Sequence, residues 1–200
     1  LMNNLLKLTS EYNSKKKELN NLSSQKPKIE EKERADPLKA QLLERLLMPE
    51  RASQQEETFS LLGFADPMVP LLLVISRGIP GSAVRSALME KAIRHCFAWR
   101  IEKMVTSPIR NGCCASVIQL DSRASALSTK WLIASMERVQ SVYSATCGED
   151  SAIYVSSVVN GIGQLPRYYK EISENLPEDE FAPCVRLIAG NRDASTHVTV

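Results

Sequence analysis

Three basic side chains at helical spacing form the clearest chemical pattern in the sequence. Lys91, Arg94 and His95 stand at i, i+3 and i+4 in the run GSAVRSALMEKAIRHCFAWRIEKM, and residues at these spacings share one side of a helix. Cations gathered in this way can hold an anion, because each charge-assisted hydrogen bond adds to binding. A solvated helix face that only keeps the domain soluble is the alternative explanation, since most surface charges do no more than that.

Candidate catalytic groups are few and lie far apart in the sequence. His197 stands near the C-terminal end, and His95 stands among cations that disfavour it as a general base toward a bound anion. Gly161-x-Gly163 lacks the third glycine of a dinucleotide-binding loop, and the sequence contains no Walker motif. The acidic run 178–180 follows a proline and indicates the first turn of a helix rather than a metal site. We therefore expect a protein that is not an enzyme and holds no metal.

The cysteines indicate a reducing environment. Their number is odd, no two form a CxxC pair, and they stand among small or apolar residues at Cys96, Cys113, Cys114, Cys147 and Cys184. This pattern favours free thiols over a disulfide framework or a structural zinc site.

The composition is typical of a soluble globular domain, with 44% hydrophobic and 24% charged residues. A net charge of +2 is too small to bind nucleic acid through overall charge, so we expect any contact with nucleic acid to be indirect. The longest apolar run, 69–75, is far too short to span a bilayer, and we expect no direct membrane insertion. No signal peptide is visible, although a chain that opens at Leu1 has the look of a fragment whose targeting signals lie elsewhere.

Residues 1–35 are predicted to form an N-terminal amphipathic helical arm followed by a linker. Heptad spacing relates Leu5, Leu8, Tyr12, Lys15, Leu19 and Leu22 over about three repeats. Three heptads with a lysine in the seam are weak evidence for a coiled coil, and an arm that packs along its own domain is the preferred interpretation. The run 15–17 forms a lysine triplet on the arm, and the mixed charges after it indicate a solvated connection.

Repeated helix start and stop signals predict an all-α globular domain over residues 36–190, followed by a flexible tail over 191–200. Asp36-Pro37 starts one helix, and Asp66-Pro67 starts an almost wholly apolar one that should be central. CASVIQL and AIYVSSVV have strand-like composition but lie between helix signals, so both are assigned to helices. Roughly eight or nine helices would then stack as a HEAT-like array of helical hairpins or as a compact bundle.

The order of several motifs resembles the C-terminal domain of the GLFG-lethal (GLE) mRNA export mediators of the nuclear pore. The motifs are RLLMPERASQQEE, a basic-x-x-basic-basic-Cys pattern at Lys91, Arg94, His95 and Cys96, the run CASVIQL, the Trp131-Leu132 step and RYYKEI. The resemblance extends over nearly the whole chain from about Lys15. Its departures are a shorter domain, no proline- and aromatic-rich stretch after the cysteine, and a histidine at position 95 where lysine is common.

The resemblance implies an all-helical, HEAT-like or MIF4G-like domain that binds a DEAD-box RNA helicase and stimulates its ATPase cycle. It also implies nucleoporin partners and a place on the cytoplasmic face of the nuclear pore complex, in nucleus and cytoplasm. The processes that it implies are mRNA export and protein transport. Inositol hexakisphosphate would be the bridging ligand. By position, the resemblance assigns this ligand to Lys91, Arg94, His95, Arg45 and Lys16, and assigns partner contacts to Lys15 and Lys17.

The alternative to this function belongs to a different class. The chain can be a non-enzymatic adaptor or tethering subunit of a larger complex that associates through its N-terminal heptads and binds no small molecule. The two hypotheses differ in a measurable way, because only the first predicts a change in the ATP turnover of a helicase.

Overall fold

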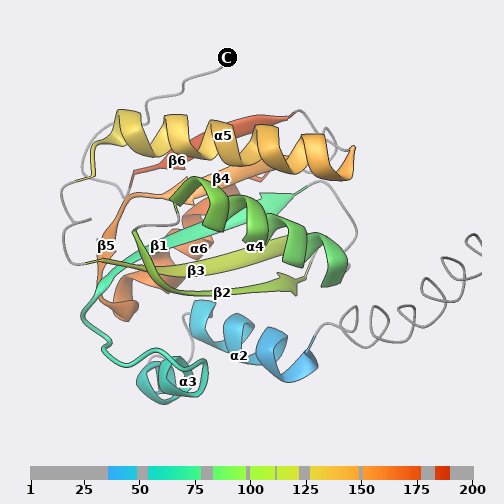
Figure 1. Cartoon of the computed structure of the whole chain (residues 1–200). Helices are drawn as coiled ribbons and strands as arrows, with labels where there is room; N and C mark the ends of the chain where they lie inside the picture. The colour runs from blue at the N-terminus through green and yellow to red at the C-terminus, as the bar shows by residue number, and fades with distance from the viewer. Residues whose placement is uncertain are drawn as a thin grey trace, which may run out of the picture. The chain divides into compact units, whose positions relative to one another are not determined.

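A mixed β-sheet lies at the centre of the part of the chain that the structure describes (Figure 1). The structure is a computed structural model, and it describes residues 36–48, 54–77, 83–97, 100–110, 112–121, 127–148, 151–176 and 183–189. All of these residues belong to one compact unit, Ala35–Val200. The predicted arm (1–35) and tail (191–200) lie outside the described residues.

Six strands form the sheet within the described residues. Five of them follow the order β2-β3-β1-β4-β6, and the short strand β5 pairs with β1 next to β4. Strand β1 runs antiparallel to β3, β4 and β5, and β4 runs parallel to β6. The strands are β1 (Pro70–Arg77), β2 (Ile101–Ile109), β3 (Cys113–Leu120), β4 (Ala152–Ser156), β5 (Val159–Asn160) and β6 (Cys184–Ile188). The helices are α2 (Pro37–Leu47), α3 (Gln55–Leu61), α4 (Ala83–Phe97), α5 (Thr129–Cys147), the 3-10 turn η3 (Ile162–Gln164) and α6 (Leu165–Glu174).

The elements from β1 to β4 follow the order βαββαβ of the ferredoxin-like motif. Helix α6 and strand β6 then extend this unit, and they place a parallel strand at the edge beyond β4. Proteins with many unrelated functions share this arrangement, so the fold alone does not indicate the function.

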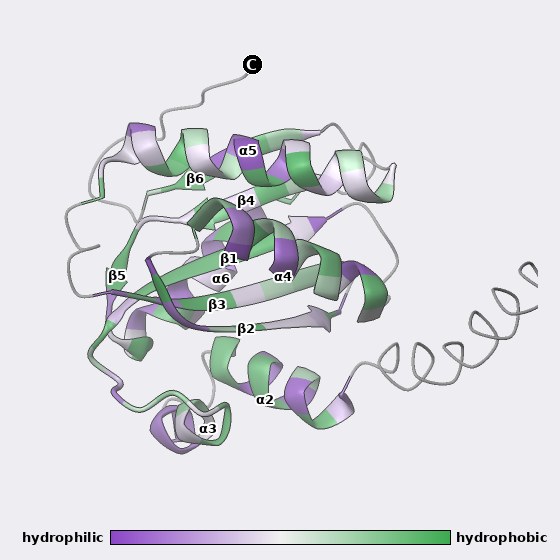
Figure 2. Cartoon of the chain, viewed as in Figure 1, coloured by the Kyte–Doolittle hydropathy of each residue, from purple (hydrophilic) through white to green (hydrophobic). Residues whose placement is uncertain are grey.

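Helices cover both faces of the sheet and create two hydrophobic cores (Figure 1). Helices α4 and α5 pack on one face, where Ile93 and Met136 are fully buried. Helices α2, α3 and α6 pack on the other, where Leu43 and Ile172 are fully buried. Figure 2 shows the central strands as largely apolar, as expected for a sheet with both faces covered.

The predicted all-α, HEAT-like and MIF4G-like stack is therefore wrong, and the domain has an α/β fold. The apolar run assigned to a central helix is strand β1, CASVIQL lies in β3, and AIYVSSVV contains β4 and the first residue of β5. A strand buried on both faces reads as a continuous apolar run, which periodicity alone does not separate from a buried helix. The cationic helix ends at Phe97, and the residues from Ile101 in the same run belong to strand β2.

The start of α2 was predicted correctly because it depends on local capping chemistry. The Asp36 carboxylate accepts hydrogen bonds from the backbone N–H groups of Leu38 and Lys39 at 3.1 and 3.3 Å, which begins α2 ahead of its first-turn proline. Helix α5 ends at Gly148, which adopts the left-handed conformation that glycine tolerates best (φ 71°).

Candidate functional site

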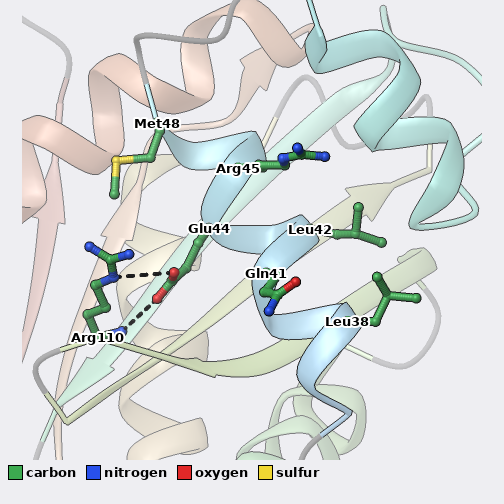
Figure 3. Close-up of a pocket in the computed structure, with 7 residues that line it drawn as sticks. All are labelled: Leu38, Gln41, Leu42, Glu44, Arg45, Met48 and Arg110. Atoms are coloured by element: carbon green, nitrogen blue, oxygen red, sulfur yellow. Dashed lines mark hydrogen bonds and ion pairs between the residues drawn. The ribbon is translucent and has the colours of Figure 1, made fainter.

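An open groove runs over the outward side of α2 (Figure 3). It has a volume of about 500 Å³. Six lining residues come from α2 and its C-terminal end, and one comes from the β2–β3 turn: Leu38, Gln41, Leu42, Glu44, Arg45, Met48 and Arg110. We call this surface the α2 groove.

The amphipathic pattern of α2 explains why apolar and polar side chains lie next to one another in the groove. Leu43, Leu46 and Leu47 are fully buried against the sheet and fix the helix. Leu38, in contrast, leaves 61% of its surface exposed, and Leu42 lies beneath the groove with 8% exposed. A contacting partner could therefore bury apolar surface here without any rearrangement of the core.

Glu44 holds Arg110 at one side of the groove. One carboxylate oxygen of Glu44 accepts a hydrogen bond from the backbone N–H of Arg110 at 3.1 Å, and the other lies 3.4 Å from the guanidinium Nε (Figure 3). The Arg110 side chain is nevertheless 75% exposed, so its remaining guanidinium N–H groups can still donate to an incoming anion. An exposed ion pair contributes little stability, and its effect here is to set the position of the arginine.

Arg45 lies on the opposite side of α2 from Arg110 (Figure 3). Its side chain is exposed and stands in the last turn of α2, where the negative end of the helix dipole favours a cation. Within the described residues it forms no ion pair and no side-chain hydrogen bond. The α2 groove therefore has a positive group at each side.

The structure brings together three of the residues predicted from the sequence. Lys91, Arg94 and His95 are all exposed on α4. Arg94 is held by Glu90, whose carboxylate lies 3.0 Å from the guanidinium, and the last turn of α4 favours cations through the helix dipole. These contacts give the cluster a structural explanation that requires no ligand.

The remaining predicted residues do not join that cluster. Arg45 lies with α2 on the other face of the sheet from α4, so the sheet separates it from the α4 cations. Lys15, Lys16 and Lys17 lie outside the described residues.

Arg110 is a site residue that the sequence analysis missed. Asn111-Gly112 follows it, and an Asn-Gly pair between two strand-like runs is the strongest short signal for a β-hairpin. Gly112 has the positive φ of 66° that such turns use. Assigning this segment to a helix hid the turn that carries Arg110 toward Glu44.

Burial keeps two thiols at the start of β3 and a phenol on α5 in their neutral forms. Burial raises the pKa of the Cys114 thiol to about 11, although hydrogen bonds from Ser86 and Ser76 act in the opposite direction. Burial also raises the pKa of Cys113 and that of Tyr143. A thiol that stays protonated at neutral pH is a poor nucleophile.

The raised pKa of Cys114 predicts alkaline destabilisation. Its contribution to stability is complete below the unfolded value of 9.0 and is lost as pH rises toward about 11, because only the unfolded chain can release this proton in that window. Replacing Cys114 with alanine should reduce the loss of unfolding free energy between pH 8 and 11 by about 2 kcal/mol. Urea titrations of both proteins across this range measure the difference, and parallel curves would contradict the assignment.

Two further observations limit what the described residues can do. Among them, no group of three or more His, Cys, Asp or Glu side chains is placed to hold a metal ion. None of their helices combines the length and the apolar character needed to cross a membrane.

Comparisons with known proteins add little to this geometry. No protein-family model matches the chain, and no curated protein sequence matches it. One solved structure that it resembles is the crystal structure of a regulator of polyketide synthase expression from Bifidobacterium adolescentis, at 14% identity and a TM-score of 0.49. The similarity covers 74% of this chain and 54% of that one, so this chain spans about half of the neighbour's length. A similarity this distant carries no argument about function.

Proposed function

We propose that this domain is a non-catalytic adaptor that binds an acidic, amphipathic segment of a partner protein in the α2 groove. The observation that carries the proposal is the arrangement of Arg45 and Arg110 on opposite sides of an open groove that is also lined by Leu38 and Leu42. Leu38 would pack against the apolar face of the segment, and the two arginines would pair with its carboxylates. The predicted heptads of residues 1–35 would attach the adaptor to a larger complex.

The state of the ionisable groups supports a binding role over a catalytic one. Nucleophilic catalysis requires a group activated by a lowered pKa or by an adjacent base. The pKa values of Cys113 and Cys114 are instead raised by burial, so both thiols remain protonated at neutral pH.

Helicase activation with inositol hexakisphosphate stays a prediction that rests on the resemblance alone. The resemblance also implied an all-helical domain, and the sheet contradicts that part of it. The adaptor is preferred because the described groove favours it independently of any resemblance.

A charge reversal in the groove tests the proposal. A synthetic amphipathic helix with glutamates along one side of its leucine face serves as the probe, and fluorescence anisotropy measures its affinity for the full chain. Arg45→Glu should weaken binding at least about tenfold, because an attractive contact becomes repulsive. Raising the salt concentration should weaken binding to the wild type as well.

The matched control is Lys91→Glu, which makes the same charge change on α4, on the opposite face of the sheet. This variant should bind the probe as the wild type does. Equal weakening by both variants would indicate a general effect of net charge and would overturn the assignment to the α2 groove. Failure of the wild-type chain to bind the probe would reject the proposal itself.

A further inference from the structure

A second hollow lies between the start of α3 and the segment that joins β5 to α6. Its volume is about 310 Å³, and it shares no lining residue with the α2 groove. Three carboxamide side chains from separate segments line it, those of Gln55, Asn160 and Gln164. Glu56 is the one charged residue among the nine that form its wall. We call this site the η3 hollow.

Gly163 lines the η3 hollow without a local structural reason to be glycine. It does not have a positive φ, and a Cβ atom added to it would meet nothing within 4 Å. Gly161 differs, because its φ is 89° and an added Cβ would lie 3.3 Å from the carbonyl oxygen of Pro67. Glycine costs conformational entropy in a helical turn relative to other residues. A side chain at 163 would therefore begin in open space beside the hollow, and the glycine leaves that space unfilled.

Hydrogen bonds fix the walls of the hollow before any ligand arrives. The backbone N–H of Ile162 donates to the carbonyl of Pro67 at 2.9 Å, which ties η3 to the segment before β1. The Gln55 side chain is 5% exposed and donates from Nε2 to the carbonyl of Leu46 at 3.3 Å. A site whose polar groups are already ordered loses less entropy when it binds.

We propose that the η3 hollow binds a small hydrophilic ligand that carries an ammonium group together with hydroxyl groups, of the chemical class of amino sugars. The carboxamides of Asn160 and Gln164 each offer a donor and an acceptor, which suits hydroxyl groups. Glu56 supplies the charge partner for the ammonium. The lining contains no cationic side chain that would favour an anion.

Met68 adds an apolar contact at the edge of the same hollow. Its side chain is 72% exposed, and its sulfur lies 3.4 Å from the position of a Cβ on Gly161. A thioether side chain adapts readily to the apolar face of a sugar ring. The domain would then bind a small molecule at a site separate from the α2 groove.

Glucosamine is the probe, and glucose and N-acetylglucosamine are its uncharged analogues. Titration calorimetry at neutral pH on the full chain should show binding of glucosamine at least tenfold tighter than that of either analogue. Glu56→Gln should remove this preference, because it deletes the carboxylate and keeps the shape. Glu57→Gln is the matched control, since Glu57 is the next residue on α3, is exposed and does not line the hollow; it should bind as the wild type does.

Gly163→Phe tests the hollow directly. The open space around position 163 should let the variant fold, which circular dichroism checks, while the ring fills the site and abolishes glucosamine binding. Binding that survives in folded Gly163→Phe would overturn the proposal. No saturable binding of any of the three sugars to the wild type, or a preference for glucosamine that Glu56→Gln leaves unchanged, would overturn it equally.

Discussion

Replacing Phe97 with alanine is expected to lower the free energy of unfolding by about 3–5 kcal/mol, the range for deleting a large buried aromatic side chain. Phe97 is fully buried at the end of α4. Its ring meets that of Trp131 edge to face, with centroids 5.2 Å apart and planes at 84°. The Arg100 guanidinium lies 5.0 Å from the centre of the same Trp131 ring. The substitution would therefore leave a cavity and remove an aromatic contact that joins α4 to α5.

Urea denaturation followed by circular dichroism measures this effect. Phe97→Leu is the control, because it keeps much of the buried volume and should cost clearly less than the alanine variant. A loss below about 1 kcal/mol for Phe97→Ala, the usual range for surface changes, would show that the packing around Phe97 is not as described.

Replacing Ser156 with alanine is expected to cost about 1–3 kcal/mol, the penalty for leaving a buried polar group unpaired. The Ser156 hydroxyl accepts a hydrogen bond from the backbone N–H of Leu73 at 3.0 Å, and both residues are fully buried. The side chain is needed because the pairing along β1 changes register by one residue between β4 and β5. A hydroxyl thus fills the place of a backbone acceptor at the irregularity.

Thermal unfolding of Ser156→Ala tests this role. Ser141→Ala provides the comparison, since Ser141 is exposed on α5 and alanine favours a helix at least as well. If both variants unfold at the same temperature, the Ser156 hydroxyl contributes no more than a surface group.

The sequence predicted those elements whose ends are set by local chemistry. Helix α2 begins after Asp36, as its capping signal indicated. Caps act over a few residues, and for that reason they can be read without knowledge of the rest of the fold.

The strands could not be recognised in the same way. Strand β1 is buried along almost its whole length, so it lacks the alternation of apolar and polar residues that marks a half-exposed strand. Strand β6 is only five residues long and pairs with β4, which lies before α6 in the sequence. Their identity depends on long-range pairing, and the apolar run of β1 is equally compatible with a buried helix.

The candidate sites also depend on contacts between residues that are far apart in the sequence. Arg45 was identified from the sequence, but for a cluster that the sheet places on the opposite face. Arg110 and Glu44 meet only because the β2–β3 turn reaches α2. The η3 hollow joins Gln55 to Asn160, and no local pattern relates residues so far apart in the chain.

The central position of β1 has a consequence for how the chain acquires its structure. This strand is the first of the sheet to be synthesised, yet the hydrogen bond from Leu73 to Ser156 spans 83 positions. The β2–β3 hairpin can close early, whereas β1 gains its β4 partner only after most of the domain has been made. Until then one edge of β1 lacks its pairing partner on the nascent chain. Folding on the ribosome would therefore be late, and a chaperone that shields short apolar segments would act mainly on residues 70–77.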